Sequence, residues 1–555
     1  MNRKHFTILF FGSLILIAGQ RSDAQDKDTT NKKRSVSITS AFKPVLKESA
    51  KINFGAAPPT ADTTRPKLNY DIPNQNLLFA YQPGSLKPMA LQIDSGGRWD
   101  NTSYIKAGFG SLKTPYVQAG LSFGDGKSNG LNIYAKHVSS EGKRDYQKFS
   151  NTAISLDGFI QTAKNLEWDA RLTMKQDQTY KYGYPDPTMN FLKDSLRQRF
   201  QTIGGRIAMH NINRTTYDIS YAPEVKIDVF SDNHKVNESN TYVNLPLSKR
   251  VGDNFQVDLG LTFDLTRLSK QDKSALNNTI YYISPSVSWI TQNINIKAGI
   301  RPSWDNKDFK LLPNITAEVS SSDRKFTFFG GWTGYIRKTT YQYLASQNPW
   351  LWAPDSLYNS RIEERFAGFK GSLGDHFTYN AKVAFNTIHN QPLFVNAYDD
   401  EQNAGKSFRY VNEIKMNVLN IGGQIGYTQQ EKFSFIGSFN IYQFGDVKTP
   451  FDKAYGLLPL EIKGALRLLV IKDLWVTADA FGWGGPSYLT RGGTSDHLGS
   501  VFDMNAGLEF RITKNLNLWS QFNNLFNKEY QRWNQYQVYG FNFVAGIVFS
   551  FAQKN

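Results

Sequence analysis

The sequence predicts an all-β protein, a transmembrane antiparallel β-barrel of about 22 strands with an extended N-terminal periplasmic segment. Alternating apolar segments, recurrent tight turns and an N-terminal export signal together favour this fold class. The alternation is plainest near the C-terminus. There one face of a period-two ribbon carries Phe541, Phe543, Ala545, Ile547, Phe549 and Phe551, and the other carries Asn542, Gly546 and Ser550.

Residues 1–24 have the composition of a secretory signal peptide. Arg3 and Lys4 precede an apolar run from Phe6 to Ala18, and small residues stand at Ser22 and Ala24. The run is shorter than the roughly 20 residues that a spanning helix needs. We therefore expect cleavage before Gln25 and export to the cell outer membrane of a Gram-negative bacterium.

Residues 25–103 differ from the rest of the chain in being polar and interrupted by proline. The prolines are Pro58, Pro59, Pro66, Pro73, Pro83 and Pro88. Such a segment has no core of its own and becomes ordered by binding to something else. We expect it to fill the barrel lumen or to bind a periplasmic or outer-membrane protein partner.

Residues 104–555 form the predicted barrel. Apolar side chains occupy every second position in segments such as 255–265, 377–385 and 433–441. A soluble sandwich would need a second sheet over each apolar face, whereas a barrel needs only outer-membrane lipid. The content of 28 Tyr and 39 Phe suits a lipid-facing band with interfacial girdles.

Tight turns give the strand count. A short polar pair before an apolar residue recurs at 164–166, 253–255, 375–377, 431–433, 472–474 and 514–516, with less regular turns near Gly126, Asn213, Asn293 and Asp323. About ten such turns, alternating with longer connections and with both termini periplasmic, imply about eleven outer loops and about 22 strands.

Composition argues against several functions. The net charge of +16 is dispersed, which favours contact with lipid headgroups over nucleic-acid binding. There is no Cys, and none of the seven His pairs with another His at a metal-ligand spacing. No Ser, His and acid set stands out as catalytic. We therefore expect no enzyme activity, no cofactor and no metal.

Aromatic residues that break the alternation fall in the longer connections. Tyr180, Tyr182, Tyr184 and Phe191 lie in one, and Tyr341, Tyr343, Trp350 and Trp352 lie in another. The second set is the candidate ligand-binding platform, for a sugar or a peptide. The alternative is that these side chains form an interfacial girdle or pack loop against loop.

The C-terminal region resembles the end of TonB-dependent receptor barrels. The resemblance rests on Phe502–Phe510, on Asn515–Trp519 and on the motif Asn523-Asn524-Leu525-Phe526-Asn527-Lys528-Glu529-Tyr530. Gly546, Phe549 and Phe551 resemble the signal that the outer-membrane assembly machinery reads on a last strand. The front of the chain departs from that family, because residues 25–103 lack plug-like patterning and a recognisable energy-coupling box.

Two functions follow from the sequence. The first is a non-enzymatic accessory or scaffold subunit of an outer-membrane protein complex, with residues 25–103 binding the partner. The second, which the resemblance implies, is a nutrient receptor or channel for uptake across the outer membrane. The apparent lack of a plug favours the first.

Overall fold

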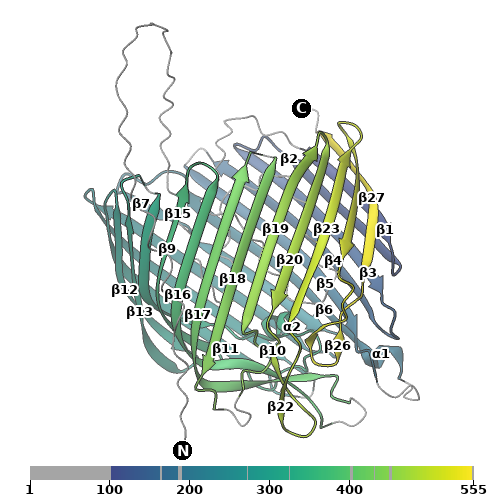
Figure 1. The fold of residues 1–555 in the computed structure, drawn as a ribbon. Coiled ribbons are helices and arrows are strands. Elements are labelled where there is room, and N and C mark those ends of the chain that lie inside the picture. Colours follow the sequence, from purple (N-terminus) through teal and green to yellow (C-terminus); the bar gives the residue numbers. More distant parts are fainter. Residues whose placement is uncertain are drawn as a thin grey trace, which may run out of the picture. The chain divides into compact units, whose positions relative to one another are not determined.

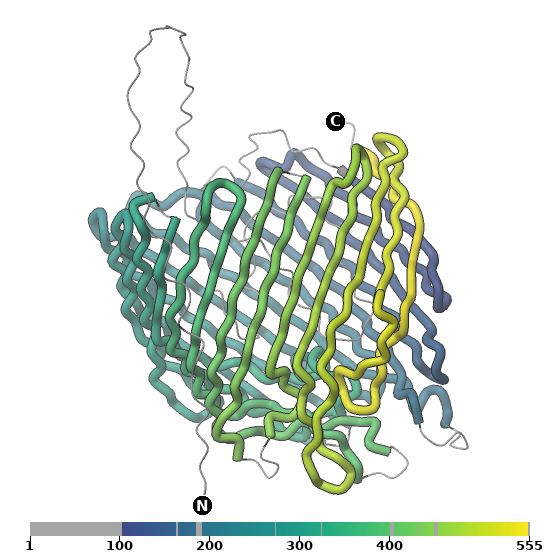
Figure 2. Tube along the Cα trace, viewed as in Figure 1, coloured from purple at the N-terminus to yellow at the C-terminus, as the bar shows by residue number. Residues whose placement is uncertain are grey.

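A computed structural model describes residues 102–552, apart from 163–164, 185–190, 272, 324, 400–403, 431 and 449–452. The expected signal peptide and nearly all of the proline-rich segment lie outside the described residues. The described chain forms a closed antiparallel β-barrel, as Figures 1 and 2 show. Among the described residues, no helix has the length and apolar character that crossing a bilayer requires.

The ring contains 23 strand elements, which are as follows: β1 (Thr102–Gly110), β2 (Thr114–Phe123), β3 (Asn129–Glu141), β4 (Lys148–Thr162), β5 (Leu166–Tyr180), β6 (Arg197–Asn211), β7 (Ile219–Tyr221), β8 (Glu224–Asp232), β9 (Asn237–Val251), β10 (Phe255–Ser269), β11 (Leu276–Ile290), β12 (Ile294–Asp305), β13 (Asp308–Ser320), β14 (Phe326–Arg337), β15 (Ser360–Leu373), β16 (Phe377–Asn396), β17 (Phe408–Gln429), β18 (Phe433–Gly445), β19 (Leu460–Ile471), β20 (Leu474–Trp483), β23 (Val501–Arg511), β24 (Leu516–Asn523) and β27 (Asn542–Ala552). Short elements lie in the connections: α1 (Lys193–Leu196), α2 (Tyr341–Gln347), β21 (Ser487–Leu489), β22 (Ser495–His497), β25 (Gln531–Trp533) and β26 (Tyr536–Gln537).

The predicted number of strands is confirmed, because β7 and β8 are two parts of one strand. Both pair with β9, and only Ala222 and Pro223 separate them. Proline has no backbone N–H to donate, so the ladder breaks there. With β7 and β8 counted together, the 23 elements make 22 strands.

The two ends of the barrel differ in their connections. Ten turns, at the predicted positions, gather at one end, which we call the turn end and which is uppermost in Figure 1. The other eleven connections form the loop end. The sequence had suggested that the connections at this end are long, but not all of them are. Only Asn306 and Lys307 join β12 to β13, with Asn306 at a φ of 56°. Asparagine tolerates this left-handed conformation, so a tight hairpin is possible there.

The outer wall is the predicted lipid-facing surface. Along β10, Phe255 is 50% exposed and Val257 44%, while Gln256 between them is 8% exposed. On β27, Phe549 is 48% exposed and its neighbour Val548 is fully buried. The alternation read from the sequence therefore points apolar side chains outward around the barrel.

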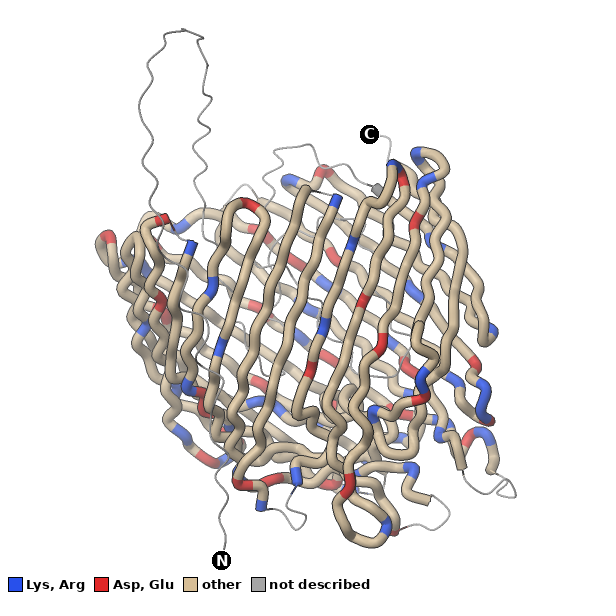
Figure 3. Tube along the Cα trace, viewed as in Figure 1, with Lys and Arg blue, Asp and Glu red and all other residues tan. Residues whose placement is uncertain are grey.

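The inner wall carries paired charges. Lys382 on β16 donates to Glu364 on β15 at 2.7 Å, with both side chains buried, and Lys370 donates to Glu318 at 2.8 Å. Both signs of charge are distributed along the strands in Figure 3. The lumen is thus polar but largely self-neutralised, which suits a barrel with water or packed groups inside.

The barrel closes where β1 pairs over its full length with β27, from Thr102 opposite Ala552 to Gly110 opposite Val544. Gly546 faces Gly108 across this seam, and Trp519 of β24 stands beside Gly546. A Cβ on Gly546 would lie 1.9 Å from the carbonyl oxygen of Ala107. The seam therefore needs glycine because the two backbones and the Trp519 indole approach closely.

The motif at 523–530 ends strand β24 through hydrogen bonds made by the Asn524 side chain. The Asn524 side chain donates to the carbonyl oxygens of Lys528 and Tyr539, both at 2.8 Å, and accepts from the Lys528 N–H at 3.0 Å. Asn524 and Asn527 both have positive φ. These bonds stop the strand at the loop end and start the last long connection, 524–541.

Candidate functional site

The described parts of four connections meet at the loop end and bury a shared set of apolar side chains, most of them aromatic. They are 181–196, 338–359, 397–407 and 524–541. We call this set the loop-end aromatic cluster; it comprises Tyr182, Phe200, Phe230, Val236, Leu268, Tyr341, Leu344, Ala345, Trp350, Leu351, Phe394, Phe408, Trp533 and Tyr536. Loops without a core of their own become ordered in this way by packing on one another.

Helix α2 fixes one side of the cluster. Its first turn is capped twice, because the Thr340 side chain accepts from the N–H of Tyr343, and the Glu238 carboxylate accepts from the N–H of Tyr341 at 2.6 Å. The Tyr341 ring is fully buried and meets Phe230 edge to face, with the ring centroids 5.3 Å apart. The helix is thereby attached to strand β9 of the barrel wall.

Trp350 and Tyr536 form the centre of the cluster. Their rings stack 3.6 Å apart, at an angle of 14°. Tyr182 meets the edge of each ring and donates its hydroxyl to the carbonyl oxygen of Gln537 at 2.6 Å. The Tyr536 hydroxyl donates to the carbonyl oxygen of Lys406 at 2.6 Å. The hydroxyls of Tyr182 and Tyr536 thus each have a partner in a different loop.

Backbone bonds reinforce these ring contacts. The Phe408 N–H donates to the carbonyl oxygen of Trp350 at 2.9 Å, and the Trp352 N–H donates to that of Phe408 at 2.7 Å. This parallel bridge opposes Leu351 to Phe408. Loop 338–359 is therefore joined to the start of β17 by main chain as well as by side chains.

The positions of these loops in the ring place the cluster across the barrel mouth. With β7 and β8 as one strand, the four loops follow strands 5, 13, 15 and 21 of the 22. Loops that leave a ring about a third of its circumference apart touch one another only by crossing the opening. These connections therefore form a cover that crosses the loop-end opening of the lumen.

Lys406 is buried in this cover, with its side-chain nitrogen 3.1 Å from the carbonyl oxygen of Gln535 and 5.4 Å from the centre of the Tyr536 ring. Burial, together with the charge of Arg144, lowers the pKa of the Lys406 ammonium to about 8. The cation–π attraction to the Tyr536 ring offsets part of the hydration free energy that the ammonium loses on burial.

The four predicted platform residues are not equivalent. Tyr341 and Trp350 are buried in the cluster, at 0% and 3% exposure, so in this conformation they pack loop on loop. Tyr343 is half-buried, with the Arg337 guanidinium 5.8 Å from its ring centre. Trp352 is 39% exposed. Ligand binding by these four side chains stays a prediction, and Trp352 is the most accessible of them.

Sequence reasoning missed the buried aromatic side chains of the last loop, two of which, Trp533 and Tyr536, belong to the cluster. Tyr530, Trp533, Tyr536 and Tyr539 recur every third residue and are all buried. A spacing of three contradicts strand alternation, and this was the available signal. A small cavity lies among these side chains, lined by Tyr182, Trp350, Arg532, Trp533, Tyr536, Val538 and Tyr539.

The residues of the predicted assembly signal lie on β27. Phe549 points outward, Phe551 stacks on it with ring centroids 5.9 Å apart, and Gly546 lies at the closure seam. Recognition of these residues by the assembly machinery stays a prediction.

No known protein-family profile matches the sequence, and no curated protein sequence matches it. Solved structures do match. The FrpB iron transporter from Neisseria meningitidis superposes with a TM-score of 0.63 at 10% identity, covering 81% of each chain. The siderophore receptor PirA from Acinetobacter baumannii gives 0.61 at 10% identity, covering 81% of this chain and 80% of that one. The copper transporter OprC gives 0.58 at 12% identity, with the same coverage.

These neighbours confirm the predicted resemblance at the level of fold. The described chain has the closed 22-strand barrel of TonB-dependent receptors. A plug, whose absence the sequence suggested, would precede β1 and so falls outside the described residues.

Proposed function

We propose that the protein is a non-enzymatic outer-membrane receptor or channel for solute uptake, whose outer mouth is held shut by the loop-end aromatic cluster. The observation that carries this proposal is the stacking of Trp350 on Tyr536, which joins loops from different sides of the mouth. A barrel with a wide polar lumen would leak if its mouth stayed open, so a protein that admits one solute needs a cover that opens and closes.

The barrel wall supports the location. A continuous apolar outer surface with a charged interior is stable only when lipid surrounds it. The structural neighbours include proteins described as an iron transporter, a siderophore receptor and a copper transporter. These descriptions support uptake as a class of function and name no solute for this chain.

An accessory or scaffold role, which the sequence favoured, remains a prediction without a supporting contact among the described residues. Its expected docking element, 25–103, lies almost wholly outside them. Stoichiometric recovery of a partner after purification in mild detergent would support it. A chain purified alone would favour the receptor.

Cell permeability tests the proposal. Cells that make the wild-type protein should resist vancomycin, which is too large for ordinary porins. Cells with the double variant Trp350→Ala/Tyr536→Ala at equal outer-membrane level should become sensitive. The matched control is Trp352→Ala, which alters an exposed aromatic in the same loop. Equal resistance of all three strains, with the loops shown to be cleaved by protease in the double variant, would contradict a passage through this lumen.

A further inference from the structure

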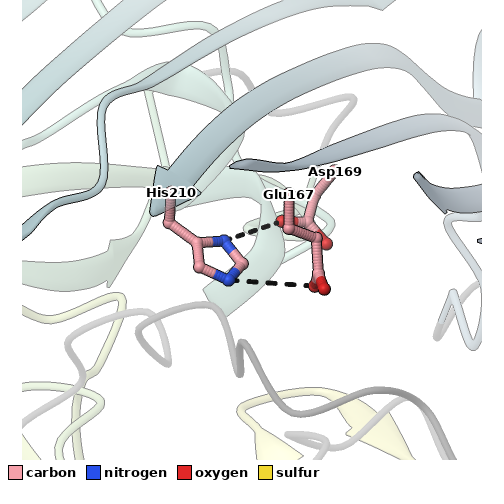
Figure 4. Close-up of side chains that lie close together, drawn as sticks. All are labelled: Glu167, Asp169 and His210. Atoms are coloured by element: carbon pink, nitrogen blue, oxygen red, sulfur yellow. Dashed lines mark ion pairs between the residues drawn. The ribbon is translucent and has the colours of Figure 1, made fainter. Parts of the chain in front are cut away.

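Three side chains with metal-ligating atoms meet on the lumen face near the turn end, at the opposite end from the aromatic cluster. They are Glu167, Asp169 and His210, and one donor atom of each lies within 4.8 Å of the others. Figure 4 shows the His210 ring directed at both carboxylates. Its Nδ1 is 3.5 Å from Asp169 Oδ2, and its Nε2 is 3.8 Å from Glu167 Oε1.

The register of two strands brings these residues together. Glu167 lies directly opposite His210 in the pairing of β5 with β6, and Asp169 is two residues further along β5. Side chains two apart share a face, so both carboxylates point into the lumen, while Trp168 between them is 41% exposed on the outer wall. In the sequence His210 follows Asp169 by 41 residues and Glu167 by 43, so local spacing hides this triad; only the strand pairing reveals it.

Neighbouring groups hold the triad in position. Gln161 on β4, opposite Glu167, donates its side-chain N–H to Glu167 Oε2 at 2.6 Å and leaves Oε1 directed at the histidine. Glu167 is 6% exposed. Phe159 and Ala208 flank Asp169 on the two neighbouring strands. A carboxylate oriented by an outer hydrogen bond is typical of metal ligands.

The separation of His210 Nδ1 from Asp169 Oδ2 suits two ligands of one cation better than a hydrogen-bonded ion pair. A charge-assisted hydrogen bond joins its atoms at about 2.7–2.9 Å, which is shorter than either contact of His210. Donor atoms around a tetrahedral Zn²⁺ at about 2.0–2.2 Å lie about 3.3–3.5 Å apart. The pair formed by Nδ1 and Asp169 Oδ2 already has this spacing. Because only one ring nitrogen can bind a given cation, Nδ1 is the ligand that His210 offers, and the Glu167 carboxylate, which now lies against Nε2, has to turn toward Nδ1 to complete the set.

We propose that Glu167, Asp169 and His210 bind a divalent transition-metal cation of the zinc class at the turn end of the lumen. Imidazole nitrogen with two carboxylates suits Zn²⁺, whereas Ca²⁺ and Mg²⁺ require six or more oxygen ligands. Two carboxylates and a neutral imidazole balance the charge of one M²⁺. Water fills the fourth position, on the lumen side. This chemistry does not depend on which solute crosses the barrel.

Calorimetric titration of Zn²⁺ into the full-length protein tests the site. The protein is purified in detergent without a polyhistidine tag and freed of metal by chelation. Wild type should bind one Zn²⁺ per chain with a Kd of about 10 μM or tighter. His210→Ala and Asp169→Asn should each weaken binding at least tenfold, and Gln161→Ala should weaken it less. The matched control is His137→Ala, because His137 bonds to Thr152 Oγ1 rather than to a carboxylate.

Three results would overturn the proposal. They are no Zn²⁺ binding by wild type at about 100 μM, unchanged affinity in both ligand variants, or tighter binding of Ca²⁺ than of Zn²⁺. Heat-modifiable migration on gels shows that each variant is folded. If His210→Ala does not fold, Asp169→Asn retains the shape of the side chain and decides the question. Co²⁺ gives a second readout, since its visible absorption should rise in wild type and not in Asp169→Asn.

Discussion

Trp350 stacks face to face on Tyr536, with ring centroids 3.6 Å apart, although the two residues belong to loops that follow strands 13 and 21 of the ring. This contact joins distant parts of the barrel rim over the lumen. It makes the mouth a packed structure with its own small core. Opening it requires the loss of aromatic contacts, so the closed state has a definite stability that substitutions change.

Trp350→Ala should loosen the loops without unfolding the barrel. Truncation of a buried Trp costs about 3–5 kcal/mol of packing, whereas the strand ladders are untouched. Chymotrypsin should therefore cleave loops 338–359 and 524–541 faster in the variant, while the heat-modifiable barrel persists. Trp352→Ala, at an exposed site, should behave as wild type. Equal cleavage of wild type and Trp350→Ala would show that the stack does not hold the loops.

Lys382→Met should destabilise the barrel wall. It leaves the buried carboxylate of Glu364 without the ammonium 2.7 Å away, at a cost of about 3–5 kcal/mol. The double variant Lys382→Met/Glu364→Gln should recover part of this loss, as unfolding in denaturant will measure. Lys325→Met, which breaks an exposed pair with Asp323, should cost less than about 1 kcal/mol. Additive losses in the double variant would mean that the two charges are not coupled.

Phe549→Asp should reduce the amount of assembled protein. A charge on the lipid face costs about 2–4 kcal/mol near the midplane and less near an interface. Ser550→Asp, on the lumen face of the same strand, should be tolerated better. Immunoblots of outer-membrane fractions measure both. Equal levels of the two variants would contradict the assigned orientation of β27.

The closed loops should become more stable as pH rises from about 8 to 10.5. The pKa of Lys406 is lowered to about 8 from its ordinary 10.5, so in this range opened loops bind more protons than closed ones. The free-energy cost of burying the charged Lys406 ammonium is fully present below pH 8 and disappears as pH rises through 10.5. Amide exchange near Lys406, corrected for intrinsic rate, should slow by at most one to two orders of magnitude. Lys406→Met should abolish this dependence, and an equal dependence in both proteins would assign it to another group.

The sequence predicts the barrel wall well because the wall depends on local alternation. Phe255 and Val257 point outward and Gln256 inward, as period two requires. Six of the ten turns lie where polar pairs interrupt the alternation, and Asn165 and Asp473 in two of them adopt positive φ. The break in the strand at Ala222 and Pro223 does not alter the strand count, since β7 and β8 on either side of it both pair with β9.

The loop end could not be predicted in the same way. Tyr182, Trp350 and Tyr536 meet because the ring brings their loops across the mouth, and no local pattern contains that information. The triad of Glu167, Asp169 and His210 likewise depends on the register of β5 against β6. A search for paired histidines therefore passes over it. The cluster arises from closure of the chain into a ring, and the triad arises from the register of one strand pair.

Single-channel conductance of the full-length protein in a planar bilayer tests the central claim most directly. If the loop-end aromatic cluster closes the mouth, wild type should be silent and Trp350→Ala/Tyr536→Ala should show stepwise openings in 1 M KCl. A wild-type protein that conducts as an open pore, or a double variant as silent as wild type, would contradict the claim that these contacts keep the barrel shut.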